Sequence, residues 1–277
     1  MSTFNITVGS ASLAISALGP NDAEHSELET WSLGSLQRQE DVQENYPLAR
    51  AVSERLYGMN VREAFAPNVA AMSGTIVSPQ DLIEKICLGE VSLYRNKQLP
   101  ADGVLLNPGE TFIMSAAGCP IILASGGDHF IASHAGRDSL IDRGAVNNSP
   151  TRRHMSIVNA MIHEFRLRKV PITDVVMVML FAIPADTFEH SFDHPQYGGY
   201  NRALYALINA RWPKCARFVD NRMFLDLESL FIEQALSTGV PRMLSAICSL
   251  AEFPHLAHTR DGIGANRRNL IVVRRDS

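Results

Sequence analysis

The chain has 277 residues, 46% of them hydrophobic and 19% charged, which is enough to bury a substantial core within one large domain. Its net charge of −4 and the lack of any block of like charges argue against a nucleic-acid or membrane-surface protein. Four cysteines are too few for a disulfide framework, no apolar run reaches ~18 residues, and no basic signal sequence is visible. We therefore expect a cytoplasmic protein with no nucleic-acid or membrane partner.

The predicted elements alternate irregularly along the chain. Alternating apolar residues predict a strand over Phe4–Ile15, apolar residues at helical spacing predict a helix over Asn45–Tyr57, and a proline in the first turn indicates a short helix over Pro79–Leu88. The later predictions are a hairpin around Gly126-Gly127, a helix near His154–Lys169, a buried strand over Asp174–Ile183, helices over Tyr200–Trp212 and Leu225–Ser237, and a strand over Asn269–Val273. No repeat or linker divides them. We predict one α+β domain over residues 1–277, with packed mixed β-sheets flanked by helices.

The hairpin carries the clearest chemical signal. Two short apolar runs flank Ser125-Gly126-Gly127-Asp128, and a Gly-Gly pair between such runs is typical of a tight turn. A turn centred between the two glycines places Cys119 opposite His134, on one face of the sheet with Cβ atoms roughly 4.5–5.5 Å apart. The pair is then half a metal site, a thiolate–imidazole dyad, or a buried cysteine beside a structural histidine.

Several short motifs extend this reading to most of the chain. In order, they are Ala101-Asp102-Gly103, Ala116-Ala117-Gly118-Cys119, His134-Ala135-Gly136-Arg137-Asp138-Ser139 and Arg260-Asp261-Gly262. Together they resemble the A-D-A-L, T-A-D-C, H-A-G-W-R-G and R-R-D-G segments of the laccase-domain family, also known as multicopper polyphenol oxidases or purine nucleoside phosphorylases. The resemblance implies the laccase-domain fold.

The resemblance to the laccase-domain family also implies a zinc site. In that family a zinc is bound by a histidine of a Q-V-H-G segment, by the cysteine and by the second histidine, and the reactions are phosphorolysis and deamination of purine nucleosides. Carried over to this chain, the resemblance implies that Cys119 and His134 are zinc ligands and that the small-molecule substrate is a purine nucleoside. Arg260 or Arg137 would then bind phosphate or stabilise a developing negative charge. Ser73 stands where the first ligand histidine should be, and a neutral hydroxyl is a poor zinc ligand.

That departure keeps a second hypothesis open. The chain also resembles the related cysteine deamidases of the cytotoxic necrotizing factor type, in which a histidine faces a cysteine without a metal. There His134 would deprotonate Cys119, backbone N–H groups near Gly118 would stabilise the oxyanion, and Ser73 would orient the site. The substrate would be a small amide or a protein glutamine. We rank the purine-nucleoside chemistry first, this hydrolase second, and an inactive family member that acts as a binding protein third.

Two further histidine pairs have the spacing of a helical metal site. His190 and His194 lie four residues apart, and His255 and His258 lie three apart. Neither pair falls in a clear predicted helix. We therefore interpret all four as surface or structural histidines rather than as a replacement for the missing ligand.

Overall fold

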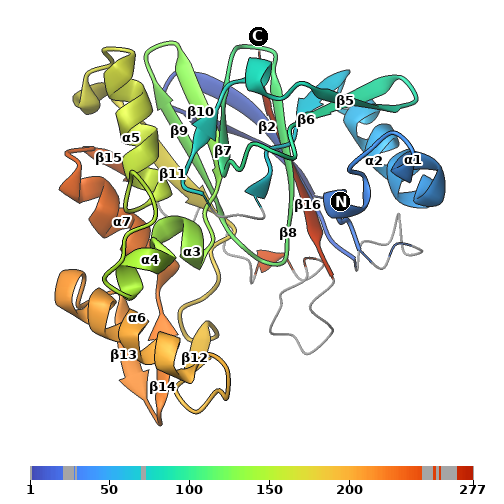
Figure 1. Cartoon of the computed structure of the whole chain (residues 1–277). Helices are drawn as coiled ribbons and strands as arrows, with labels where there is room; N and C mark the ends of the chain where they lie inside the picture. Colours follow the sequence, from blue (N-terminus) through green and yellow to red (C-terminus); the bar gives the residue numbers. More distant parts are fainter. Residues whose placement is uncertain are drawn as a thin grey trace.

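The computed structural model describes residues 2–20, 28, 30–69, 73–244, 252–253, 256 and 267–276. Within these residues the strands form three sheets, with helices on the outer faces of the two larger ones (Figure 1). The largest sheet contains, in spatial order, β1 (Ser2–Val8), β2 (Ala11–Leu18), β16 (Asn269–Arg275), β8 (Thr111–Ala116), β3 (Glu63–Phe65), β6 (Val91–Arg95) and β5 (Glu84–Leu88).

The second sheet carries the candidate site at one end. Its strands are β15 (Arg242–Leu244), β11 (Val176–Leu180), β9 (Ile121–Gly126), β10 (His129–His134), β7 (Gly103–Leu106) and β4 (Ile76–Val77). The third sheet is small and consists of β12 (Glu189–Ser191), β14 (Arg222–Leu225) and β13 (Ala216–Val219).

The helices are mostly short. They are α1 (Asp41–Glu44), α2 (Tyr46–Gly58), α3 (Arg137–Leu140), α4 (Arg143–Val146), α5 (Ile157–Leu167), α6 (Gly198–Arg211) and α7 (Leu227–Ser237), with the 3₁₀ turns η2 (Leu33–Ser35), η4 (Pro79–Asp81) and η5 (Ile172–Asp174). Within the described part of the chain, no helix combines the length and apolar character that a bilayer span requires.

Two apolar cores hold four layers together. The larger core lies between the two main sheets and continues under α5 and α7, and it includes Phe112 of β8, Ile131 of β10 and Phe165 of α5. The smaller core lies between the outer face of the first sheet and α2, where Val52 and Leu56 are fully buried. Each of the two main sheets therefore has one face against the other main sheet and one face against helices (Figure 1). The predicted fold class, α+β with mixed sheets flanked by helices, is confirmed.

Strand β16 occupies the interior of the first sheet. It pairs antiparallel with β2 on one side and with β8 on the other. Its last residue, Arg275, is buried and donates hydrogen bonds to the backbone oxygens of Leu106 and Asp128, which belong to the second sheet and its hairpin turn. The strand thus joins the first strands of the chain to the middle of the sequence and links the two sheets.

Two predicted elements are wrong. The segment Phe4–Ile15 is not one strand, because a turn at Gly9-Ser10 divides it into β1 and β2. The segment Pro79–Leu88 is not a helix: it forms η4 and then β5, in which buried Ile86 and Leu88 alternate with exposed neighbours. In both segments a strand shows the alternation of exposed and more buried residues that is typical of β-structure. The turns that bound these strands are only two or three residues long, so the sequence pattern does not reveal them. The helices predicted at Asn45–Tyr57, His154–Lys169, Tyr200–Trp212 and Leu225–Ser237 and the strands at Asp174–Ile183 and Asn269–Val273 are present.

The hairpin exists, but its predicted register is wrong. His129 pairs with Gly126, and His134 pairs with Ile121 rather than with Cys119. The two turn residues are Gly127 and Asp128, of which only Gly127 has a positive φ, of 57°. One glycine therefore satisfies the turn, and Gly126 belongs to the strand.

Truncating a core side chain of α5 tests the layered packing. Phe165 is fully buried between the helix and the second sheet, so we expect Phe165→Ala to lower the free energy of unfolding by about 3–5 kcal/mol. Leu167 lies on the same helix but is 61% exposed, and Leu167→Ala should cost less than about 0.5 kcal/mol. Urea unfolding with an unchanged denaturant slope measures both values, and equal losses in the two variants would contradict the packing.

Candidate functional site

His134 and Asp102 form a cross-strand pair. His134 ends β10, and Asp102 immediately precedes β7. Ser133 pairs with Gly103, and the His134 N–H donates a 2.8 Å hydrogen bond to the Asp102 backbone oxygen, which continues the same ladder. Directly opposed residues point to the same face of a sheet, so the imidazole and the carboxylate meet there.

A buried hydrogen-bond network fixes the orientation of the imidazole. His134 Nδ1 lies 2.9 Å from Ser139 Oγ and 3.3 Å from Asp102 Oδ1, and Ser139 Oγ lies 3.1 Å from the same carboxylate oxygen. A carboxylate only accepts hydrogen bonds, so Ser139 donates to Asp102, and Nδ1–H donates to both of them. The other carboxylate oxygen accepts a 2.6 Å hydrogen bond from the Gly74 N–H. The remaining nitrogen, Nε2, is left to face the cysteine.

Cys119 lies just before β9 and is half-buried. The Ala135 N–H donates to the Pro120 oxygen at 2.9 Å, which extends the hairpin ladder and places Cys119 opposite Gly136. A Cβ atom at Gly136 would lie 3.0 Å from His134 Nε2 and 3.1 Å from Cys119 Sγ. Sulfur and ring therefore converge on the space that a side chain at Gly136 would fill.

The electrostatics of the pair favour a protonated imidazole. Burial by itself lowers the pKa of His134, but the negative charge of the Cys119 sulfur and hydrogen bonds to Asp102 and Cys119 outweigh it and raise the pKa from 6.5 to about 10. Carboxylate, imidazole and thiol thus stand in the order of an orienting acid, a base and a nucleophile. This arrangement is suited to nucleophilic attack by sulfur.

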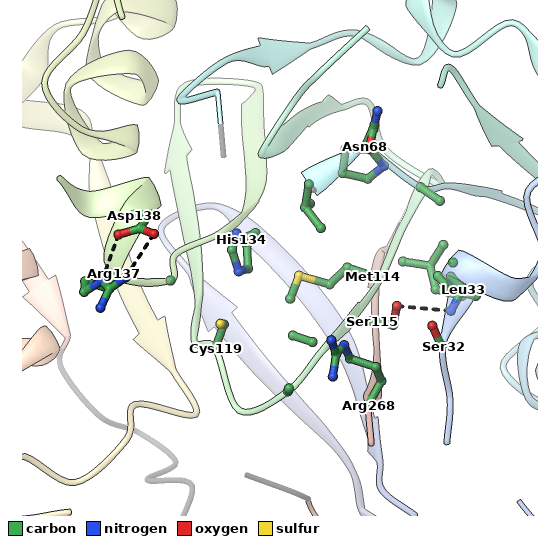
Figure 2. Close-up of a pocket in the computed structure, with 18 of the residues that line it drawn as sticks. Ser32, Leu33, Asn68, Met114, Ser115, Cys119, His134, Arg137, Asp138 and Arg268 are labelled. Carbon is green, nitrogen blue, oxygen red and sulfur yellow. Dashed lines mark hydrogen bonds and ion pairs between the residues drawn. The ribbon is translucent and has the colours of Figure 1, made fainter. Parts of the chain in front are cut away.

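A cavity of about 550 Å³ opens onto the sulfur and the ring (Figure 2). Its walls come from the η2 segment, β8, the start of α3, β12 and the residue that precedes β16. Three arginines, Arg95, Arg137 and Arg268, belong to its lining together with one acidic residue, Asp138. Asp138 is buried, which raises its pKa, but Arg137 and Arg143 outweigh this effect and hold the pKa below its usual value.

The other predicted site residues are placed differently. Ser73 Oγ accepts a 3.3 Å hydrogen bond from the Thr75 N–H and does not belong to the cavity lining, although its neighbour Gly74 binds Asp102. Arg260 lies outside the described residues, as do His255 and His258. His194 is exposed, whereas His190 is buried in β12 and lines the cavity.

Two residues of the network, Asp102 and Ser139, were absent from the site predicted from sequence. Asp102 was noted only as part of a motif, and it is now the carboxylate beside His134. Its position follows from the pairing of β7 with β10, which joins segments far apart in the chain. The position of Ser139 follows from the one-turn helix α3, which begins three residues after His134 and places the Ser139 hydroxyl beside the imidazole.

Comparison with known structures agrees with this architecture. The structure of Neisseria meningitidis protein NMB0706, described as DUF152, superposes with a TM-score of 0.65 at 16% identity and covers 100% of both chains. YlmD from Geobacillus stearothermophilus gives 0.62 at 17% identity over 96% of this chain and 92% of its own. The Bacillus licheniformis hypothetical protein YfiH gives 0.63 at 13% identity over 95% and 91%.

These similarities establish the fold. They agree with the predicted α+β fold class, which is confirmed. No protein-family model matches the sequence, and no curated protein matches it either.

A methyl group at Gly136 tests the convergence of sulfur and ring. We expect Gly136→Ala to push Cys119 and His134 apart, because the added Cβ would lie within 3.1 Å of both side chains. The pKa of His134, followed by NMR of its ring protons, should fall, and alkylation of Cys119 should change in rate. Gly199→Ala is the matched control, since nothing lies within 4 Å of its Cβ position. Identical His134 titrations in both variants would contradict the geometry.

The raised pKa of His134 also predicts a pH dependence. A group whose pKa rises on folding stabilises the native state fully below its unfolded value and loses that contribution as pH approaches its folded value. Stability should therefore fall as pH rises from 6.5 towards about 10. Cys119→Ala removes the largest of the interactions that raise the pKa of His134 and should remove much of this slope. Cys87→Ala, at an exposed cysteine, should retain it; urea unfolding over this pH range decides.

Proposed function

We propose that the protein is a cysteine hydrolase that cleaves the C–N bond of a carboxamide and releases ammonia without a metal. The observation that carries the proposal is the chain of contacts from Asp102 through His134 to Cys119, of which His134 and Cys119 line a cavity. This is the second hypothesis from the sequence, and the carboxylate moves it ahead of the first.

The reaction follows from the order of the three groups. With the proton of the Cys119 thiol held on His134 Nε2, the thiolate adds to the amide carbon, so that the carbonyl oxygen gains a negative charge. The C–N bond then breaks as Nε2 returns its proton to the departing nitrogen, and ammonia leaves a thioester on Cys119. Water adds to the thioester and gives a proton to Nε2; the C–S bond breaks, the carboxylic acid is released, and the thiol is restored.

Backbone groups beside the nucleophile are suited to the oxyanion. Among the described residues, the N–H groups of Gly118 and Cys119 have no hydrogen-bond acceptor. Free N–H groups next to a nucleophile can stabilise the charge that develops on the carbonyl oxygen. Asp102 and Ser139 hold Nδ1–H throughout, which keeps Nε2 directed at the reacting atoms.

Purine-nucleoside chemistry is the second candidate, favoured by the shared fold and by a cavity large enough for a small molecule. The donor set does not fit the zinc of that chemistry. Within the described ranges, no three His, Cys, Asp or Glu side chains converge as a metal site. Cys119 and His134 supply two ligands, and Ser73 binds the backbone instead of completing the set.

Substitution of the nucleophile and of the orienting acid tests the proposal. We expect Cys119→Ala to abolish ammonia release from a panel of small carboxamides and glutaminyl peptides. Asp102→Asn should lower it by at least about 100-fold, because the imidazole loses its orienting charge. A coupled ammonia assay measures both variants, and Cys87→Ala, at an exposed cysteine, is the matched control that should remain fully active.

The same preparations separate the two candidates. Zinc and copper content per chain and release of free purine base are measured alongside ammonia. About one zinc per chain that disappears in Cys119→Ala, with release of purine base, would establish the second candidate and refute the metal-free hydrolase. Undiminished ammonia release from Cys119→Ala would refute the hydrolase by itself.

A further inference from the structure

We propose that the cavity recognises a negatively charged group on the substrate through Arg95, so that the substrate is a small anionic carboxamide. This inference rests on the proposed function, since it names the substrate class of the same site. Arg95 has no place in the motifs that identified Cys119 and His134.

Arg95 is a buried residue with a cavity in front of it. It ends β6, is 9% exposed, and lines the same cavity as Cys119. Its Nη1 atom donates two hydrogen bonds, to the backbone oxygens of Leu33 and Leu36, each 2.6 Å long. These bonds hold the guanidinium against the η2 segment and fix its plane.

The rest of the guanidinium is not satisfied by the protein. Three of its five N–H donors remain after the two bonds from Nη1, and no carboxylate lies within ion-pair distance among the described residues. Burial lowers the pKa of Arg95, and the nearest acids, Glu84 and Asp41, only oppose this from a distance. A buried charge without a counter-charge destabilises the folded state, and an anion in the cavity would offset that cost.

Arg137, which lines the same cavity, shows the contrast because its partner is a carboxylate. Arg137 donates to both Asp138 oxygens, at 2.8 and 3.1 Å, and Arg143 contacts the same carboxylate at 3.4 Å. The one acid of this cluster is therefore already shared by two arginines. Arg95 and Arg137 together bring two positive charges to the lining against the single negative charge of Asp138, so this part of the cavity has a positive balance.

This charge balance selects a class of substrate. Carboxylates and phosphates match the planar fork of a guanidinium, and both bind it through paired hydrogen bonds. A glutamine side chain within a protein carries no such group. The cavity therefore fits a small molecule that has a carboxamide at one end, for Cys119, and a carboxylate or phosphate at the other.

Alkylation of Cys119 tests the electrostatic potential of the cavity without requiring any enzymatic activity. Iodoacetate carries a negative charge and iodoacetamide does not, so the ratio of their rates at Cys119 reports the local charge. We expect the ratio at Cys119 to exceed that at exposed Cys87 of the same protein. Arg95→Gln should lower the Cys119 ratio by about three- to tenfold. Mass spectrometry of the two peptides measures both rates, and Arg62→Gln, at an exposed arginine, is the control.

The neutral reagent controls for damage to the fold. If Arg95→Gln merely loosened the η2 segment, both reagents would change together, and the ratio would stay that of the wild type, which overturns the proposal. Arg95→Lys keeps the charge and should keep most of the ratio.

Glutarate and inorganic phosphate, added as competitors of iodoacetamide, identify the anion. Protection by one of them assigns a carboxylate or a phosphate, and protection by neither overturns the proposal. Ammonia release from protein glutamine alone would also overturn it while leaving the hydrolase intact. A Cys119 that neither reagent labels would instead refute the hydrolase and, with it, this inference.

Discussion

The hydrogen-bond register of β7, β10 and β9 is the constraint on which the site depends. His134 stands between Asp102 on one neighbouring strand and the residues just before β9 on the other, and the backbone ladder sets both distances. A slip of one residue would send the imidazole to the opposite face of the sheet. The site is thus built at the ends of paired strands: His134 ends β10, and Asp102 and Cys119 lie just before β7 and β9.

The buried charges divide into those that the protein satisfies and those that it does not. Asp102 accepts hydrogen bonds from Gly74, Ser139 and His134, and Asp138 is held by Arg137 and Arg143. Each of these carboxylates therefore has hydrogen-bond or ion-pair partners within the described structure. The hydrogen bonds of Arg95 to the described part of the chain go to the carbonyl oxygens of Leu33 and Leu36 only. This difference separates groups that orient the site from a group that has unused capacity for a ligand.

Much of the fold and half of the site could be predicted from sequence. The helices and long apolar strands have periodic patterns, and Cys119 and His134 flank a strong turn signal. The register was predicted wrongly because Gly126-Gly127 offers two turn centres, and the choice depends on which glycine takes a positive φ. Asp102 and Arg95 could not be predicted as site residues, since they reach the site through the pairing of distant strands, which no local pattern specifies.

The position of β16 has a consequence for biosynthesis. The strand lies between β2 and β8, yet it is translated long after both of them. Until it emerges from the ribosome, β2 and β8 each present an unpaired edge, and β8 is one wall of the cavity. Cys119 and His134, on the second sheet, are therefore synthesised well before the first sheet, which contributes β8 to the cavity wall, can close around β16. Chaperones that shield strand edges are expected to matter for this fold until its final strand is in place.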